Sequence, residues 1–451
     1  MQAEAQTWER LLHSTGGALE LSKCFFYVMA WKFKKDGTPM LLTPDEMPNI
    51  SIHLTTGTSN TLHPIAHKST YDAHKTLGLK PNPSVDTAAC FTTQLAKGNC
   101  ISEGVRLSPM ERNEALMGYR HIWLPSIGYP LACWSLCEND LYQIEKNSVN
   151  AFLTKMRYCP TTARAIIFGS KIIRGLGLTR LRAAKGVNQI SLFLQHIRLY
   201  DSIGVMYHIG YCWYQLYCGT SFAALSNPSF ALPHQPVGWF TRLRVFLAST
   251  NLSIDMPPAL LRLPTPLRRG DSNLMEAFCG LNWTPRKIEL LNYCRLFLQV
   301  EFLSELCSAE GNNLLAPAWQ GHALPSHSNL LWPNQARPSG WTLWRQALAE
   351  LFLLDPAHKL RNPRDLPLRI RLGRWHPTHS AHRLWPSYQS AAHLFRRHTS
   401  GFTAHLDTLE GRLPSRTSAA TPSGRQSLPQ ATPATAPCDP APLRRDRHTC
   451  L

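Results

Sequence analysis

The stretch AQTWERLLHSTGGALELSKCFFYVMAWKF, residues 5–33, decides the fold expected for the N-terminal part of the chain. Its apolar residues first recur at helical spacing, which predicts a helix over residues 2–13. Gly16-Gly17 ends this helix, because glycine accepts the left-handed conformation that follows a last helical turn. Alternating apolar and polar residues then predict a strand over 19–22, and an aromatic run predicts β-structure over 24–33.

The residues that follow extend this mixed α and β region over 1–105. Asp36-Gly37 is a strong hairpin signal, so a returning strand is expected from Leu41. Ile50 and Ile52 predict a further strand.

Helical signals dominate residues 106–200 and 201–395. Capping boxes at Ser108–Glu111 and Ser135–Glu138 predict two helix starts, and Thr284-Pro285 predicts another. The second of these helices has a continuous apolar face, made of Leu141, Ile144, Val149, Phe152, Leu153 and Met156.

From about residue 396 the composition shifts to Ser, Thr, Pro, Ala and Arg, which predicts a disordered tail over 396–451. The expected fold class is therefore an α+β N-terminal part, followed by two mainly α-helical parts and the disordered tail.

The charge balance favours an anionic partner. The 451 residues include 47 lysines and arginines against 29 aspartates and glutamates, a formal net charge of +18. Lysine and arginine displace the counterions of a phosphate backbone, so RNA or DNA is the expected partner. The alternative is a basic chain without such a partner.

The 13 cysteines do not have the spacing of a zinc site, and the first residues do not have the pattern of a signal peptide. Reduced thiols in a nuclear or cytoplasmic compartment are expected. Residues 202–241 contain no charged side chain, but their glycines, tyrosines, histidine and glutamine differ from the composition of a spanning helix. We expect a buried helix there and no membrane partner.

A basic set lies in FGSKIIRGLGLTRLRAAKG, residues 168–186. Small residues let a backbone approach a phosphate while cations neutralise it, so this set is expected to contact nucleic acid. A solvated basic face is the alternative. The cations are Lys171, Arg174, Arg180, Arg182 and Lys185, and the glycines are Gly169, Gly175, Gly177 and Gly186.

No metal site is expected in this chain. His376, His379 and His382 recur at three-residue spacing, but Pro377 interrupts a helix there and neighbouring arginines repel a cation. Asp271 is expected to cap a helix or to pair with a neighbouring arginine.

Six segments, spread over residues 6–348, resemble the C-terminal half of the reverse-transcriptase polyproteins of retroelements, of the type common in algal and water-mould genomes. The order of these segments along the chain is part of the resemblance. They are QTWERLLHSTGGALELSKC, HKTLGLKPNP, FGSKIIRGLGLTRLRAAKG, RRGDSNLMEAF, LLNYCRLFLQVEFLSEL and WPNQARPSGWTLWRQAL.

This resemblance implies that residues 1–105 are the end of a polymerase palm, 106–200 a thumb on the template-primer, and 201–395 an extension specific to these elements. Template-primer here means RNA, DNA or an RNA/DNA hybrid. The catalytic aspartates would lie before Met1, so the missing upstream polymerase segment is a further expected partner.

The resemblance also assigns roles to three residues. Lys23 would lie on the strand after the catalytic loop, either as a general acid that protonates leaving pyrophosphate or as a solvated lysine. Leu77 and Gly78 would shape a primer grip, or else form an ordinary turn.

Reverse transcriptases hold two Mg²⁺ ions with an Asp-Asp pair and one earlier aspartate, and no Asp-Asp dipeptide occurs in this sequence. Mg²⁺ therefore belongs to the complete polymerase, and polymerase activity of this chain alone is not expected. We expect a reverse-transcriptase remnant that binds template-primer. The alternatives are a helical scaffold protein without a nucleic-acid role, and an enzyme completed by a separate chain that carries the aspartates.

Overall fold

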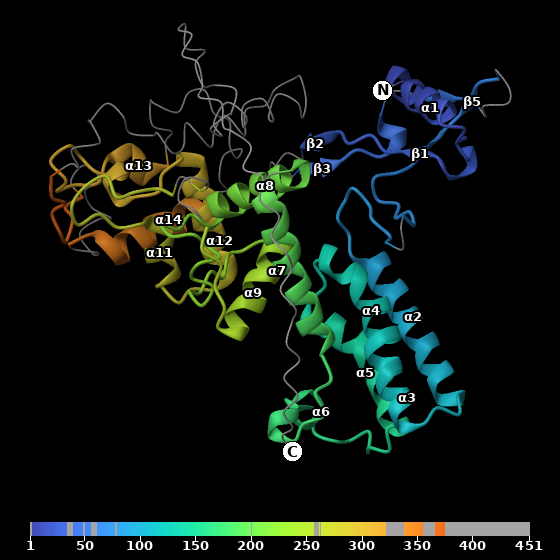
Figure 1. Ribbon diagram of the computed structural model, residues 1–451. Coiled ribbons are helices and arrows are strands. Elements are labelled where there is room, and N and C mark those ends of the chain that lie inside the picture. Colours follow the sequence, from blue (N-terminus) through green and yellow to red (C-terminus); the bar gives the residue numbers. More distant parts are fainter. Residues whose placement is uncertain are drawn as a thin grey trace, which may run out of the picture.

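The computed structural model is mainly helical, and among the residues that it describes the short strands lie in the N-terminal part (Figure 1). An α+β beginning and a helical remainder are thereby confirmed at this coarse level. The described residues are 2–33, 39–47, 50–55, 61–76, 79–199, 201–256, 261, 263–321, 338–354 and 366–374. The tail predicted over 396–451 and the histidines at 376, 379 and 382 lie outside these ranges.

The N-terminal part begins with α1 (Gln2–Ser14), as predicted. The helix ends where expected: Gly16 has a φ of +77°, and the Gly17 N–H donates to the carbonyl of Leu12 at 3.0 Å. Glycine is suited to this position because a side chain would strain the left-handed backbone.

Three two-stranded pairs follow α1. They are β1 (Phe25–Phe26) parallel to β6 (Ala66–His67), β2 (Trp31–Phe33) antiparallel to β3 (Pro39–Leu41), and β4 (His53–Leu54) antiparallel to β5 (His63–Pro64). The β2–β3 pair has the antiparallel register that a hairpin requires, although Asp36-Gly37 lies outside the described residues. The buried residues that these elements share are few: Ile52, Leu54 and Ile65.

Two strand predictions are wrong. In place of a strand over 19–22 the chain makes a 3₁₀ turn, η1 (Leu21–Lys23), in which the Lys23 N–H donates to the Glu20 carbonyl at 2.9 Å. The Ser22 hydroxyl also donates to the Glu20 carboxylate at 2.7 Å, so local hydrogen bonds compete with the strand. The strand expected at Ile50 begins only at His53.

A helical bundle occupies the middle of the chain (Figure 1). Its elements are α2 (Ala88–Leu107), α3 (Arg112–Met117), a π-helix η3 (Gly118–Trp123), α4 (Leu124–Gly128), η4 (Tyr129–Cys133), α5 (Glu138–Lys155), α6 (Arg164–Phe168), η5 (Lys171–Ile173) and α7 (Leu181–Leu199). The apolar face predicted for the helix of residues 138–155 is buried, as expected.

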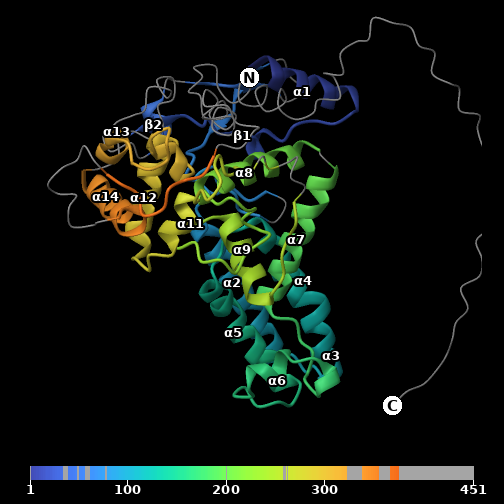
Figure 2. The same cartoon turned by 90° about the vertical axis from the view of Figure 1, so that its left-hand side faces the viewer.

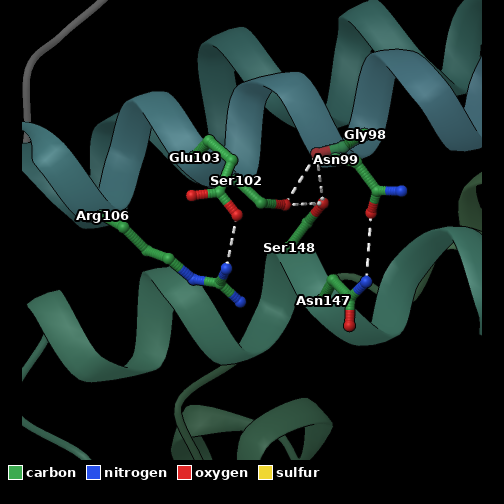
Figure 3. Close-up of polar contacts among 7 residues, drawn as sticks. All are labelled: Gly98, Asn99, Ser102, Glu103, Arg106, Asn147 and Ser148. Carbon is green, nitrogen blue, oxygen red and sulfur yellow. Dashed lines mark hydrogen bonds and ion pairs between the residues drawn. The ribbon is translucent and has the colours of Figure 1, made fainter.

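Helices α2 and α5 pack through small and polar residues (Figure 3). The Ser102 and Ser148 hydroxyls lie 2.9 Å apart, and both donate to the carbonyl of Gly98. A Cβ at Gly98 would lie only 3.3 Å from the Ile144 carbonyl oxygen. The two backbones therefore approach closely, with the buried hydroxyls satisfied by hydrogen bonds.

Helix α2 crosses the boundary predicted between residues 105 and 106, and it packs mainly against α5. Ser108 accordingly ends α2, donating its N–H to the Gly104 carbonyl at 3.0 Å, and does not start a helix. The second box is displaced by two residues: α5 begins at Glu138, but its cap is Cys137, whose N–H donates to Asp140 at 2.8 Å.

The remaining elements are α8 (Ser202–Cys218), α9 (Trp239–Thr250), α11 (Leu274–Cys279), α12 (Pro285–Leu298), η6 (Leu303–Leu306), α13 (Ala316–Gln320) and α14 (Pro338–Phe352). Helix α12 starts at the predicted Thr284-Pro285. Within the described part of the chain, no helix has the length and apolar character needed to cross a bilayer.

Candidate nucleic-acid interface

The region around α6 has an unusual charge composition. Between residues 146 and 200 the sequence contains no aspartate or glutamate. It contains ten lysines and arginines: Lys146, Lys155, Arg157, Arg164, Lys171, Arg174, Arg180, Arg182, Lys185 and Arg198. The absence of carboxylates over this run is a stronger signal for an anionic partner than net charge, and it is visible in the sequence alone.

The segment after α6 folds back on the helix in a fixed loop. The Leu176 N–H donates to the Ile166 carbonyl at 2.9 Å, and the Gly177 N–H donates to Gly169 at 2.9 Å. The buried Tyr119 of the π-helix donates its hydroxyl to the Thr179 carbonyl at 2.8 Å. Ile167 and Leu178 are buried in the core of the bundle, so the loop is anchored on both sides.

This loop stands at one extremity of the molecule. In two views at right angles, α6 lies at the end of the helical bundle that points away from α1 (Figure 1 and Figure 2). An anchored loop with exposed side chains at such a position is accessible to a large partner.

Three cations of the predicted set are exposed at this extremity, namely Lys171, Arg174 and Arg180. We call these three residues the α6 basic surface. Neither Lys171 nor Arg174 forms a salt bridge within the described residues, and the Arg180 guanidinium lies 5.0 Å from the ring centroid of Phe168. Cations without a carboxylate partner are available to neutralise phosphates.

Arg182 is partly committed elsewhere. Its guanidinium forms a 3.0 Å ion pair with Glu138, and its side chain is 27% exposed. A neighbouring carboxyl group, Glu145, is buried and accepts a hydrogen bond from the Leu181 N–H at 3.1 Å. Burial raises the pKa of Glu145, and Arg180 and Arg164 partly offset that effect.

Lys185 does not lie on this surface, so its assignment to nucleic-acid contact is wrong. Its side chain is buried, and the ammonium donates to the Leu136 carbonyl at 2.7 Å. Burial, together with the charge of Arg242, lowers the pKa of Lys185 to about 8. This lysine serves the contact between the start of α7 and the segment before α5.

The glycines of this segment serve packing, in contrast to the expectation that they let phosphate approach. A Cβ at Gly175 would lie 2.3 Å from the Gly169 carbonyl oxygen, so the backbone at Gly175 is in direct contact with the backbone at Gly169. A Cβ at Gly186 would lie 2.4 Å from the ring of Phe246, so α7 and α9 meet there. Both contacts exclude a side chain.

Of the three residues expected to serve polymerase chemistry, the structure describes Lys23 alone. Lys23 is exposed on the 3₁₀ turn η1 and not on a strand. Leu77 and Gly78 lie outside the described residues, although the flanking Thr76 and Leu79 exchange backbone hydrogen bonds of 2.8 and 2.9 Å. Among the described residues no group of histidines, cysteines and carboxylates could hold a metal ion.

Asp271 has a structural position. Its carboxylate accepts backbone hydrogen bonds from Ser272 at 3.0 Å and Ser304 at 2.9 Å, and burial raises its pKa. The following helix, α11, is capped instead by Asn273, which accepts from the Glu276 N–H at 3.0 Å. The capping role expected for Asp271 is therefore wrong.

Comparison of the chain with protein-family models, with curated proteins and with solved structures finds no match.

Proposed function

We propose that this chain binds the phosphate backbone of a nucleic-acid duplex, RNA, DNA or a hybrid, through the α6 basic surface. The observation that carries the proposal is the coincidence of two features. A 55-residue stretch, 146–200, lacks carboxylates, and its exposed cations Lys171 and Arg174 lack salt-bridge partners within the described residues. The cations of such a surface attract phosphates, and the stretch contains no carboxylate that would repel them.

In the wider proposal the chain is a remnant of a retroelement reverse transcriptase, with residues 106–200 in the position of a thumb. It would hold template-primer without chemistry of its own, in the nucleus or cytoplasm, and Mg²⁺ would belong to the complete polymerase. The resemblance of six ordered segments supports this proposal. The helical bundle, with α6 at its far end (Figure 1) and the exposed cations Lys171 and Arg174 in the loop after α6, is compatible with it.

Binding of the full chain to labelled duplex, hybrid and single-stranded probes tests the first proposal. We expect the triple variant Lys171→Glu, Arg174→Glu, Arg180→Glu to weaken duplex binding by roughly tenfold or more at moderate salt, because three phosphate contacts are lost.

A matched control changes the same charge elsewhere: Lys287→Glu, Arg371→Glu and Arg374→Glu, three exposed cations of the C-terminal part. We expect this control to weaken binding far less than the α6 variant. Equal losses in both variants would mean that net charge and not this surface drives binding, and no loss in either would remove the proposal.

A second candidate function is protein interaction through the N-terminal part, as in a scaffold or in docking of a further polymerase segment. The observation that favours it is the exposure of Trp8, Leu11, Met29 and Trp31 beside a small core. This candidate would be supported if the chain bound none of the three probes at low salt and formed oligomers in solution that were lost when Trp8 and Trp31 were replaced.

A further inference from the structure

Two adjacent, exposed isoleucines lie in the 3₁₀ turn η5 of the α6 loop. Ile172 is 93% exposed and Ile173 is 76% exposed. Single exposed apolar residues are common on protein surfaces, but a neighbouring pair of branched side chains at an extremity is a patch that a partner can cover.

The turn that carries them is held in place by its own backbone. The Ile173 N–H donates to the Ser170 carbonyl at 3.1 Å, and the Arg174 N–H donates to Lys171 at 3.0 Å. The Ser170 hydroxyl accepts from the Ile172 N–H at 3.2 Å. Gly175 closes the turn by donating its N–H to Ser170 at 2.9 Å. The isoleucines therefore present a preorganised apolar point.

Cations stand on both sides of this point. Lys171 precedes the isoleucines and Arg174 follows them, and both are exposed. Arg174 adopts the left-handed conformation, with a φ of +63°, at the end of the turn. An apolar point between two cations matches a partner that offers an apolar interior behind an anionic surface.

We propose that Ile172 and Ile173 act as a wedge that inserts between base pairs of a duplex, while Lys171 and Arg174 contact the flanking phosphates. This inference rests on the proposed function. Isoleucine is among the side chains that proteins insert at base steps, where they partly unstack the bases and kink the helix. The unstacking is offset by apolar burial and by the two phosphate contacts.

A bilayer also combines an anionic surface with an apolar interior, but the turn has no membrane-interface signature. Interfacial segments usually carry tryptophan or tyrosine at the boundary. Residues 169–179 contain neither. Duplex nucleic acid is therefore the partner to which the geometry points.

The test uses the full chain and a duplex containing the fluorescent base 2-aminopurine, whose emission rises when it is unstacked. The variant is Ile172→Ser with Ile173→Ser, and the matched control is Ile166→Ser, a 51% exposed isoleucine on α6 itself. Both variants change exposed residues, and thermal unfolding verifies that each remains folded.

We expect the wild-type chain and the Ile166→Ser control to raise the emission, and the double variant to abolish the rise and weaken binding by about tenfold. The dependence of binding on salt should stay as in the wild type, because no charge is changed.

Binding by the wild type without any rise in emission, with the double variant binding equally well, would overturn the wedge while leaving the proposed function intact. Absence of duplex binding by the wild type would remove both. Binding to vesicles containing phosphatidylserine that requires Ile172 and Ile173, with no effect of these residues on the duplex, would also overturn the wedge.

Discussion

The ammonium of Lys185 donates a hydrogen bond to the carbonyl oxygen of Leu136 at 2.7 Å, inside the protein. This contact joins residues 49 positions apart in the sequence and ties α7 to the segment before α5. A lysine that the sequence assigns to nucleic acid is thereby removed from the surface, and the exposed cations of the predicted set are Lys171, Arg174 and Arg180.

Replacing Lys185 with methionine should stabilise the protein near neutral pH. The folded state lowers the pKa of this lysine from 10.5 to about 8, so the folded protein binds fewer protons than the unfolded protein between these pH values. The buried charge therefore destabilises the wild type below about pH 8. Its free energy of unfolding should rise between about pH 8 and pH 10.5. We expect Lys185→Met to have a free energy of unfolding roughly 2 kcal/mol higher than the wild type at pH 7, after allowance for one lost hydrogen bond. The increase in stability between about pH 8 and pH 10.5 should be absent from this variant.

Urea unfolding at pH 7 and pH 10 checks this prediction, with the exposed Lys146→Met of α5 as the control. Duplex affinity of Lys185→Met should equal that of the wild type. A large loss of affinity in a folded Lys185→Met protein would return this lysine to the interface and contradict its buried position.

Replacing Gly186 with alanine should destabilise the protein, because the added Cβ would lie 2.4 Å from the Phe246 ring. The two helices must then separate, at a cost of about 1–3 kcal/mol. The matched control is Gly104→Ala in α2, where nothing lies within 4 Å of the new Cβ. There we expect a gain of about 0.5–1 kcal/mol, since alanine favours a helix. Denaturant unfolding would contradict the contact if both changes had the same sign.

Replacing Glu301 with glutamine should stabilise the protein at alkaline pH. Burial raises the pKa of this carboxyl from 4.5 to about 7, with Arg295 opposing the rise. The folded state binds more protons, so the contribution of this group to stability is present below about pH 4.5 and is lost as the pH rises through 7.

We expect Glu301→Gln to gain roughly 3 kcal/mol at pH 8 and little at pH 4.5, as an upper estimate for a shift of this size. Thermal unfolding across this range measures the difference, with the exposed Glu103→Gln as the control. Parallel pH profiles for wild type and Glu301→Gln would show that this carboxyl is not the group that titrates.

The sequence predicts elements whose signals are local. The apolar face of α5 and the Thr284-Pro285 start of α12 need only neighbouring residues, and both are observed. Helix α2 gave no comparable signal because it meets α5 through Gly98, Ser102 and Ser148, and hydrophobic periodicity does not detect a contact made by small and polar residues.

The candidate interface divides in the same way. Lys171, Arg174 and Arg180 are exposed, as expected for cations that contact an anionic partner. Lys185 and Gly186 could not be assigned correctly from local sequence, because their partners are Leu136 and Phe246, which are distant along the chain. The isoleucine pair was visible in the sequence, but only the fixed turn reveals that it faces solvent.

The salt dependence of duplex binding tests the central claim most directly. For a chain that contacts phosphates through the α6 basic surface, the logarithm of the binding constant should fall linearly with the logarithm of salt concentration. Changing Lys171, Arg174 and Arg180 to glutamate should reduce the slope by about 2–3, close to 0.9 for each lost phosphate contact. An identical slope in the triple variant and the wild type would contradict the assignment of this surface to nucleic acid.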